Sequence, residues 1–266
     1  MPNGSDIDTT LGPLIPGMSI KRRWAFLLEI QMEQAHDLSW RAKQVLAGGF
    51  QTLSKNPNRY PQGIAPEFLE RGLGAYVYDH SARRYVDLVA GLGPILLGHC
   101  DPNVTSCVMD QIRKGSVFSL GNGLEVEVAE LLAELIPSVE TVRFGKNGAD
   151  VTNAAVRLAR FETSRKHVIF CGYHGGHDSY IATTPNSGGV LSELAQFNHQ
   201  IQWGNDKQLN ELFNLIGQQV AAIMVEVPPP VYGDTHCEED YALFLSFLRE
   251  SAHDNGALFI MDEVVT

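Results

Sequence analysis

Apolar and polar positions follow two different periods in the second half of the chain. Short runs of consecutive apolar residues, typical of strands buried on both faces, alternate with longer stretches in which apolar residues recur every three to four positions, as in amphipathic helices. This alternation predicts a mostly parallel sheet with helices on both faces, in which ligands gather at the carboxyl ends of the strands. The predicted strands are 141–144, 167–170, 220–225 and 257–261, and the predicted helices are 102–114, 124–135, 150–164, 207–217 and 239–254.

The first 90 residues have a different pattern. Residues 1–19 show little periodicity, whereas apolar residues at helical spacing predict a helix from about residue 24 to residue 48. After a connector that contains several prolines, the segment 75–88 alternates as in a β-hairpin. We therefore predict two domains: a tail, helix and hairpin segment of a small domain at 1–90, and a C-terminally truncated large domain at 91–266.

The charge and the cysteines of the chain restrict its partners and its compartment. With 31 acidic against 20 basic residues, the formal net charge is -11, which argues against a general nucleic-acid or anionic-membrane surface because both need clustered basic residues. No apolar run approaches the ~18 residues of a membrane span, and the first residues lack the pattern of a signal peptide. The four cysteines have no paired spacing, which favours reduced thiols and the cytoplasm. A small-molecule partner is the resulting expectation.

The first candidate site is the turn at 144–150, which joins a predicted strand to a predicted helix. Backbone N–H groups and the positive end of the helix point to one spot there, so the turn forms a cup that suits an anion such as phosphate. Neither the dinucleotide-binding glycine pattern nor the nucleotide-binding P-loop pattern is present. The alternative interpretation is an ordinary strand-to-helix turn in which Gly148 supplies a positive φ.

The second candidate site is the turn at 171–178, which offers an aromatic ring and two imidazoles directly after an apolar strand. One alternative is a metal site, but structural zinc sites usually draw their ligands from two separated pairs, and no second pair is present. Another alternative is a set of polar turn residues without a chemical role. The metal hypothesis would use Cys171, His174, His177 and Asp178.

The third candidate site is a pair of acids, Glu226 and Asp262, each at the carboxyl end of an apolar strand. An ionised carboxylate in such a place needs a cationic partner or strong hydrogen bonds to offset its desolvation. A ligand cation is one possible partner for each acid. An arginine of the chain itself is the structural alternative.

Taken in this order, the phosphate cup, the aromatic-His-Gly turn and the strand-end acid resemble the class III aminotransferases, which are pyridoxal-phosphate enzymes of fold type I. The resemblance implies the α/β fold of those enzymes, with the large domain incomplete in this chain. The likeness begins near residue 39. It is carried by 142–160 as the phosphate loop and helix, by 172–175 as the ring-stacking turn and by 259–266 as the Asp-Glu-Val segment, while 47–49 and 93–99 are most similar to members like glutamate-1-semialdehyde 2,1-aminomutase.

The resemblance implies how the chain would hold the phosphate of pyridoxal 5'-phosphate (PLP). Gly148 and Ala149 would bind it through their backbone N–H groups, and Asn147 offers a side-chain donor. The family commonly has Ser-Gly-Thr at these three positions. The chain therefore lacks a hydroxyl that the family uses.

The resemblance also implies roles for five residues around the pyridine ring. Tyr173 and Val264 would lie on its two faces, with His174 beside it in the same turn. Asp262 would pair with the protonated ring nitrogen, so that the cofactor can act as an electron sink. Glu226 would support the ring or its neighbours.

The implied activity is the transfer of an amino group between an amine donor and a carbonyl compound, by an aminotransferase or an aminomutase, in a complete enzyme that is a homodimer. In the family, the lysine that forms the Schiff base follows the Asp-Glu-Val segment, but here the last lysine is Lys207. We therefore expect no catalytic lysine and no transamination by this chain alone. The alternative is a non-catalytic relative or split-gene subunit that binds the cofactor or a partner chain.

Overall fold

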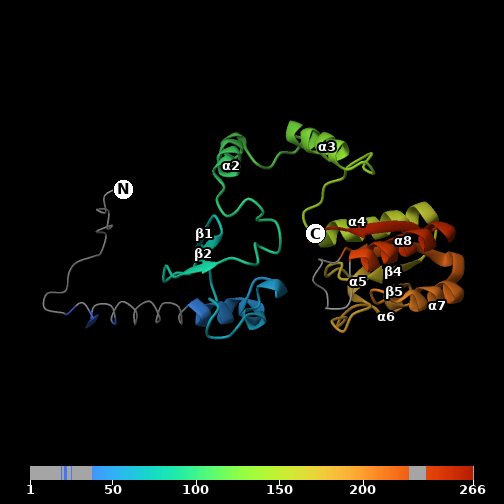
Figure 1. Cartoon of the computed structure of the whole chain (residues 1–266), viewed down its shortest axis with the longest axis horizontal. Helices are drawn as coiled ribbons and strands as arrows, with labels where there is room; N and C mark the ends of the chain where they lie inside the picture. Colours follow the sequence, from blue (N-terminus) through green and yellow to red (C-terminus); the bar gives the residue numbers. More distant parts are fainter. Residues whose placement is uncertain (1–18, 20, 23–24, 26–37, 228–237, 266) are drawn as a thin grey trace. The chain divides into compact units, whose positions relative to one another are not determined.

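The computed structural model describes residues 19, 21–22, 25, 38–227 and 238–265 (Figure 1). Of the helix predicted from about residue 24 to residue 48, residues 38–45 are helical, and residues 24 and 26–37 lie outside the described residues. Contacts divide the chain into two compact units, Met1–Ser116 and Val117–Thr266, which are described separately. The functional boundary expected after residue 90 stays a prediction. Among the described residues, no helix has both the length and the apolar character needed to cross a membrane.

The first unit contains a small antiparallel sheet of three strands in the order β1-β2-β3. The predicted hairpin is confirmed, because β2 and β3 pair through Val77 and Tyr85. Asp79 fixes the turn between them: its carboxylate accepts the N–H groups of Ser81 and Arg83 and the hydroxyl of Tyr85. The elements are η1 (Ala47–Gly49), η2 (Leu53–Lys55), η3 (Pro57–Arg59), β1 (Arg71–Leu73), β2 (Tyr76–Tyr78), β3 (Arg84–Val86) and α2 (Pro102–Lys114).

The second unit contains a sheet of four parallel strands in the order β5-β4-β6-β7, flanked by helices. The predicted α/β class and parallel pairing are confirmed. The elements are α3 (Gly123–Leu135), α4 (Gly148–Thr163), β4 (His167–Cys171), α5 (Asp178–Ile181), α6 (Ser192–Ala195), β5 (Asn198–Gln200), α7 (Asp206–Ile216), η4 (Gly217–Gln219), β6 (Val220–Glu226), α8 (Glu238–Asp254) and β7 (Leu258–Asp262).

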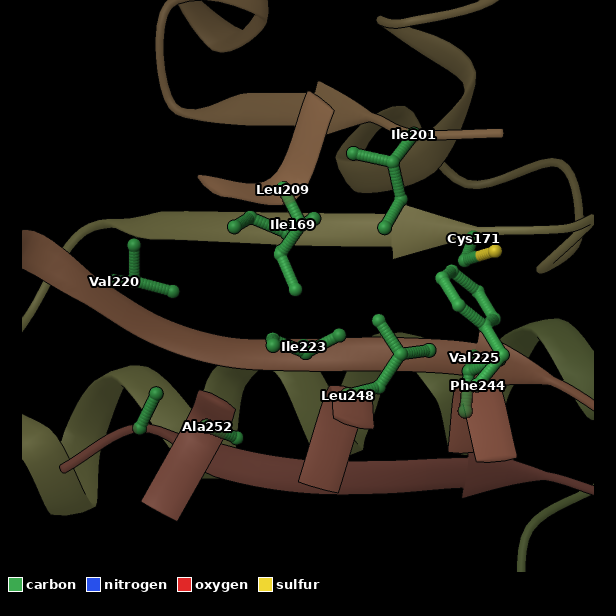
Figure 2. Close-up of a cluster of buried hydrophobic side chains, with 11 residues drawn as sticks. Ile169, Cys171, Ile201, Leu209, Val220, Ile223, Val225, Phe244, Leu248 and Ala252 are labelled. Carbon is green, nitrogen blue, oxygen red and sulfur yellow. The ribbon is translucent and has the colours of Figure 1, made fainter. Parts of the chain in front are cut away.

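Two apolar cores cover the two faces of this sheet. Alternate residues of a strand point to opposite faces, so Ile223 of β6 packs with Leu248 of α8 on one face (Figure 2), while Met224 packs with Val156 of α4 on the other. All four side chains are essentially inaccessible to water. Complete burial of each contributes about 1.5–3 kcal/mol to folding. The two cores fix β6 between its helices, and so fix where its carboxyl end lies.

The predicted strand at 141–144 is wrong. These residues have no strand assignment in the structure, and Phe144 is half exposed. A strand needs a neighbour that completes its ladder of hydrogen bonds, and none of the described strands pairs with this segment. An apolar pattern alone does not provide that neighbour. Conversely, β5 was not predicted, because its sequence Asn-His-Gln is short and polar.

Candidate functional site

The two strand-end acids lie side by side. In the parallel ladder of β6 and β7, Glu226 is the register partner of Asp262. The ladder continues by one bond, in which the Val227 N–H donates to the Asp262 carbonyl at 3.0 Å. Asp262 is buried and Glu226 is half-buried. The sheet therefore brings together two carboxylates that lie far apart in the sequence.

Asp262 is held by hydrogen bonds on both of its oxygens. Oδ2 lies 2.8 Å from Nδ1 of His174, and Oδ1 accepts the N–H of Val264 at 3.1 Å. The other ring nitrogen of His174, Nε2, lies 3.2 Å from the carbonyl oxygen of Cys171. A carbonyl can only accept, so Nε2 of His174 donates to Cys171, and the imidazole ring links the Asp262 carboxylate to the backbone at the end of β4.

Glu226 holds the turn that follows β4. Its Oε2 accepts the N–H of Tyr173 at 2.8 Å. The preceding residue, Gly172, has φ +107°, and an added Cβ there would come within 2.5 Å of Glu226 Cβ. Glycine is therefore required both by its backbone conformation and by this close approach. Tyr173 itself is exposed, with 58% of the residue accessible.

The start of α4 borders the same cluster. Asn147 is the N-cap: its Oδ1 accepts the N–H of Asp150 at 2.9 Å, and its Nδ2 donates to the Asp150 carboxylate at 2.8 Å. A Cβ on Gly148 would lie 2.8 Å from Val264 Cγ1, and one on Gly175 would lie 2.6 Å from Ala149 Cβ. The N-terminus of the helix therefore lies against the residues that follow β7 and against the turn at 171–178.

The reason for a glycine at position 148 differs from the one predicted from the sequence. The alternative interpretation of the turn gave this glycine a positive φ, but its φ is not among the positive values of the described residues. What excludes a larger side chain is the neighbouring Val264. All eight predicted site residues thus belong to one cluster: Asn147, Gly148, Ala149, Tyr173, His174, Glu226, Asp262 and Val264.

Two residues of this neighbourhood were missed by the sequence analysis. Thr152 of α4 donates its hydroxyl to the carbonyl of His174 at 2.8 Å, and so joins the helix to the turn. Tyr180 of α5 donates its hydroxyl to the carbonyl of Gly172 at 2.9 Å. Neither lies in a motif, and each donates to a backbone carbonyl outside its own helix. Only the tertiary structure reveals them.

The residues of the metal hypothesis do not form a set of metal ligands in the described part of the chain. Cys171 is fully buried in the core shared with α8 (Figure 2). His174 is hydrogen-bonded to Asp262. His177 is partly exposed and contacts Asp150 at 3.2 Å. Within the described ranges, no group of three or more His, Cys, Asp or Glu side chains is placed to hold a metal ion.

The buried thiol leads to a prediction about alkaline stability. Burial, helped by the negative charge of Glu226, raises the pKa of Cys171 from 9.0 to about 12. Between these values the folded protein keeps a proton that the unfolded chain releases, so the free energy of unfolding decreases as the pH rises. We expect the urea midpoint to fall more steeply from pH 9 to pH 11 in the wild type than in Cys171→Ala. Equal slopes would contradict the expected role of this thiol.

Comparison with known proteins gives a consistent result. The profile of the family described as "Aminotransferase class-III" matches residues 60–266. Glutamate-1-semialdehyde 2,1-aminomutase from Halobacterium salinarum is 36% identical over 244 residues, which cover 88% of this chain and 53% of that protein. The chain spans about half the length of the curated relatives it matches.

Two solved structures share the fold. The ω-transaminase from Sphaerobacter thermophilus superposes with a TM-score of 0.74 at 25% identity. The superposition covers 85% of this chain and 54% of the transaminase chain. A PLP-containing structure of the FumI protein of Sphingopyxis sp. MTA144 superposes with a TM-score of 0.76 at 25% identity, again over 85% of this chain and 54% of the other. With its family profile, its relatives and its parallel sheet in agreement, the chain belongs to the class III aminotransferases.

Proposed function

We propose that this chain carries the cofactor-binding part of a PLP-dependent aminotransferase or aminomutase. The observation that carries the proposal is the buried carboxylate of Asp262, held by His174 and by the N–H of Val264 beside the N-terminus of α4. A buried carboxylate favours a cation, and a helix N-terminus favours an anion. A protonated pyridine that carries a phosphate has both charges, so the donor set of the cluster fits PLP.

Each residue of the cluster has a role in binding. The backbone N–H groups of Gly148 and Ala149 bind the phosphate, because the first N–H groups of a helix lack partners within the helix. The side chain of Asn147 contributes less than the family's hydroxyls do, because its oxygen and one of its N–H groups are engaged with Asp150. The exposed side chains of Tyr173 and Val264 provide apolar contact for the two faces of the ring.

The chemistry depends on the charge at Asp262. Bound PLP supplies an electron sink for the electrons released when the substrate Cα loses its proton. Asp262 keeps the ring nitrogen protonated by accepting its hydrogen bond, and His174 orients that carboxylate through its Nδ1. Glu226 accepts the N–H of Tyr173 and so holds the turn at 171–178 in place. These residues bind and orient, and none of them is placed to form a covalent bond with the cofactor.

The catalytic lysine is the part that this chain does not provide in our proposal. Among the described residues, no lysine is hydrogen-bonded or ion-paired to any of the eight clustered residues, although Lys146 precedes the N-cap in sequence. We therefore expect the 266-residue polypeptide to bind the cofactor without turnover. The same observation supports a second candidate function, a non-catalytic or split-gene subunit that binds the cofactor or a partner chain.

The proposal extends to the substrates, the assembly and the compartment of the whole protein. The substrates are a small amino donor and a carbonyl acceptor, and the 36% identity to an aminomutase supports an aminomutase-like member. A homodimer is supported by the very exposed apolar side chains of Leu88, Leu96 and Leu97 in the first unit. The unpaired spacing of the cysteines supports the cytoplasm.

The proposal is tested by titrating the purified chain with pyridoxamine 5'-phosphate. This amine form of the cofactor cannot form imines with surface lysines, so a response reports the non-covalent site alone. We expect saturable induced circular dichroism of the pyridine ring, with competition by inorganic phosphate, and no turnover when PLP, an amino donor and a keto acid are supplied. Absence of saturable binding would overturn the proposed function, and measurable turnover would overturn the expected inactivity.

A further inference from the structure

Tyr180 packs against three aromatic rings next to the proposed cofactor site. Its side chain is buried, with 6% of the residue accessible. Its ring meets the rings of Tyr173 and His174 edge to face, with centroids 5.5 Å and 5.4 Å away and interplanar angles of 86° and 90°. The ring of Phe170 completes the contact at 5.6 Å and 75°. Edge-to-face packing is the favoured geometry for aromatic pairs, so Tyr180 restricts the orientation of both neighbours.

The hydroxyl of Tyr180 acts on the backbone of the same turn. It donates to the carbonyl of Gly172 at 2.9 Å, and the N–H of Tyr173 donates to Glu226 at 2.8 Å. This carbonyl and this N–H belong to one peptide group. The plane of that peptide is therefore held from both sides, and it sets the direction in which the Tyr173 side chain leaves the backbone.

Burial of Tyr180 also keeps its hydroxyl able to donate. Desolvation is the largest cause that raises the pKa of this phenol above 10.0. The phenol is therefore protonated throughout the neutral range and remains a hydrogen-bond donor to the Gly172 carbonyl.

We propose that Tyr180 is a positioning residue for the PLP site: its ring and hydroxyl hold the turn at 172–175 so that Tyr173 and His174 are oriented before the cofactor binds. This inference rests on the proposed function. It assigns no contact between Tyr180 and the cofactor. Its effect is to raise the population of the binding-competent turn, and apparent affinity falls in proportion when that population falls.

The test compares the wild-type chain with Tyr180→Phe and Tyr180→Leu in titrations with pyridoxamine 5'-phosphate. Tyr180→Phe keeps the ring contacts and removes only the hydrogen bond to Gly172, so we expect about threefold to tenfold weaker binding. Tyr180→Leu also removes the edge-to-face contacts, so we expect at least about tenfold weaker binding. At saturation, the induced circular dichroism of the ligand should be reduced in Tyr180→Leu, because Tyr173 no longer has one orientation.

The matched control is Tyr85→Phe in the first unit, which removes a phenol hydrogen bond of 2.9 Å to Asp79 outside the cluster. This variant should bind the ligand as the wild type does. The urea midpoint of each variant separates stability from binding: a merely structural Tyr180 would lower the midpoint and leave affinity and dichroism unchanged at saturation. That result in both Tyr180 variants would overturn the inference.

A parallel titration of Asp262→Asn distinguishes a failure of the proposed function from a failure of the proposed role of Tyr180. If the wild type binds saturably and Asp262→Asn does not, while both Tyr180 variants bind normally, the proposed function stands and the role of Tyr180 is refuted. If the wild type shows no saturable binding, the proposed function fails and the role of Tyr180 fails with it. Should Tyr180→Leu not fold, Tyr180→Phe alone decides, because it keeps the packing of the ring.

Discussion

Replacing Asp262 by asparagine is expected to weaken the binding of pyridoxamine 5'-phosphate by at least about thirtyfold, which corresponds to roughly 2 kcal/mol or more. The reason is that, in the proposed site, the substitution removes the buried carboxylate that would face the protonated ring nitrogen of the ligand. In the wild type, the two oxygens of this carboxylate accept from Val264 and pair with His174. Titration followed by induced circular dichroism measures the change directly.

The asparagine variant separates charge from structure. Its oxygen can accept the N–H of Val264, and its amide can donate to Nδ1 of a neutral His174 that still donates Nε2–H to the Cys171 carbonyl. We therefore expect a free energy of unfolding within about 1 kcal/mol of the wild type, because no buried polar group loses its partner. Asp254→Asn is the matched control: it makes the same charge change on an exposed side chain of α8. Equal affinities for the wild type and Asp262→Asn would show that no cationic nitrogen pairs with this residue.

Replacing Gly172 by alanine is expected to lower the free energy of unfolding by about 2–4 kcal/mol. Two effects add. The φ of +107° is unfavourable for an L-residue, and the new Cβ would come within 2.5 Å of Glu226 Cβ, so the carboxylate or the turn must move. Urea denaturation followed by circular dichroism measures the loss. Because the turn carries Tyr173 and His174, we expect ligand affinity to fall as well.

Gly189 provides the control that separates these two effects. Its φ is +85°, but an added Cβ would meet nothing within 4 Å. Gly189→Ala should therefore show the backbone cost alone, about 1–2 kcal/mol. If Gly172→Ala and Gly189→Ala lost the same stability, the close approach of Glu226 would have no energetic weight.

The sequence predicted the parts of the site that depend on local pattern. Asp262 and Glu226 were recognised because a charged residue directly after an apolar strand must lie at the carboxyl end of a parallel sheet. The direct pairing of His174 with Asp262 could not be predicted from the residues alone. The two residues are 88 positions apart, and only the order β4-β6-β7 brings the turn after β4 to the end of β7.

The errors have physical causes of the same kind. The segment at 141–144 has the apolar pattern of a strand, but strand formation depends on a partner that no local pattern specifies. For Gly148, the sequence offered conformational freedom as the reason for glycine, whereas the reason is a tertiary contact with Val264. Tyr180 gave no signal at all, because one aromatic residue in a four-residue helix has no periodicity to interpret.

The position of β7 gives the site a property that no single residue has. Within the described residues, β7 forms one side of the four-stranded sheet and pairs with β6 alone, and it carries Asp262. In the proposed site, a ligand bound at Asp262 would have a higher affinity for the paired form of this strand, so binding and pairing would be thermodynamically linked. Local opening of an edge is governed by a smaller free energy than global unfolding. The amide protons of β7 should therefore exchange with solvent more slowly when the ligand is present, and the edge of the sheet becomes the natural reporter of its occupancy.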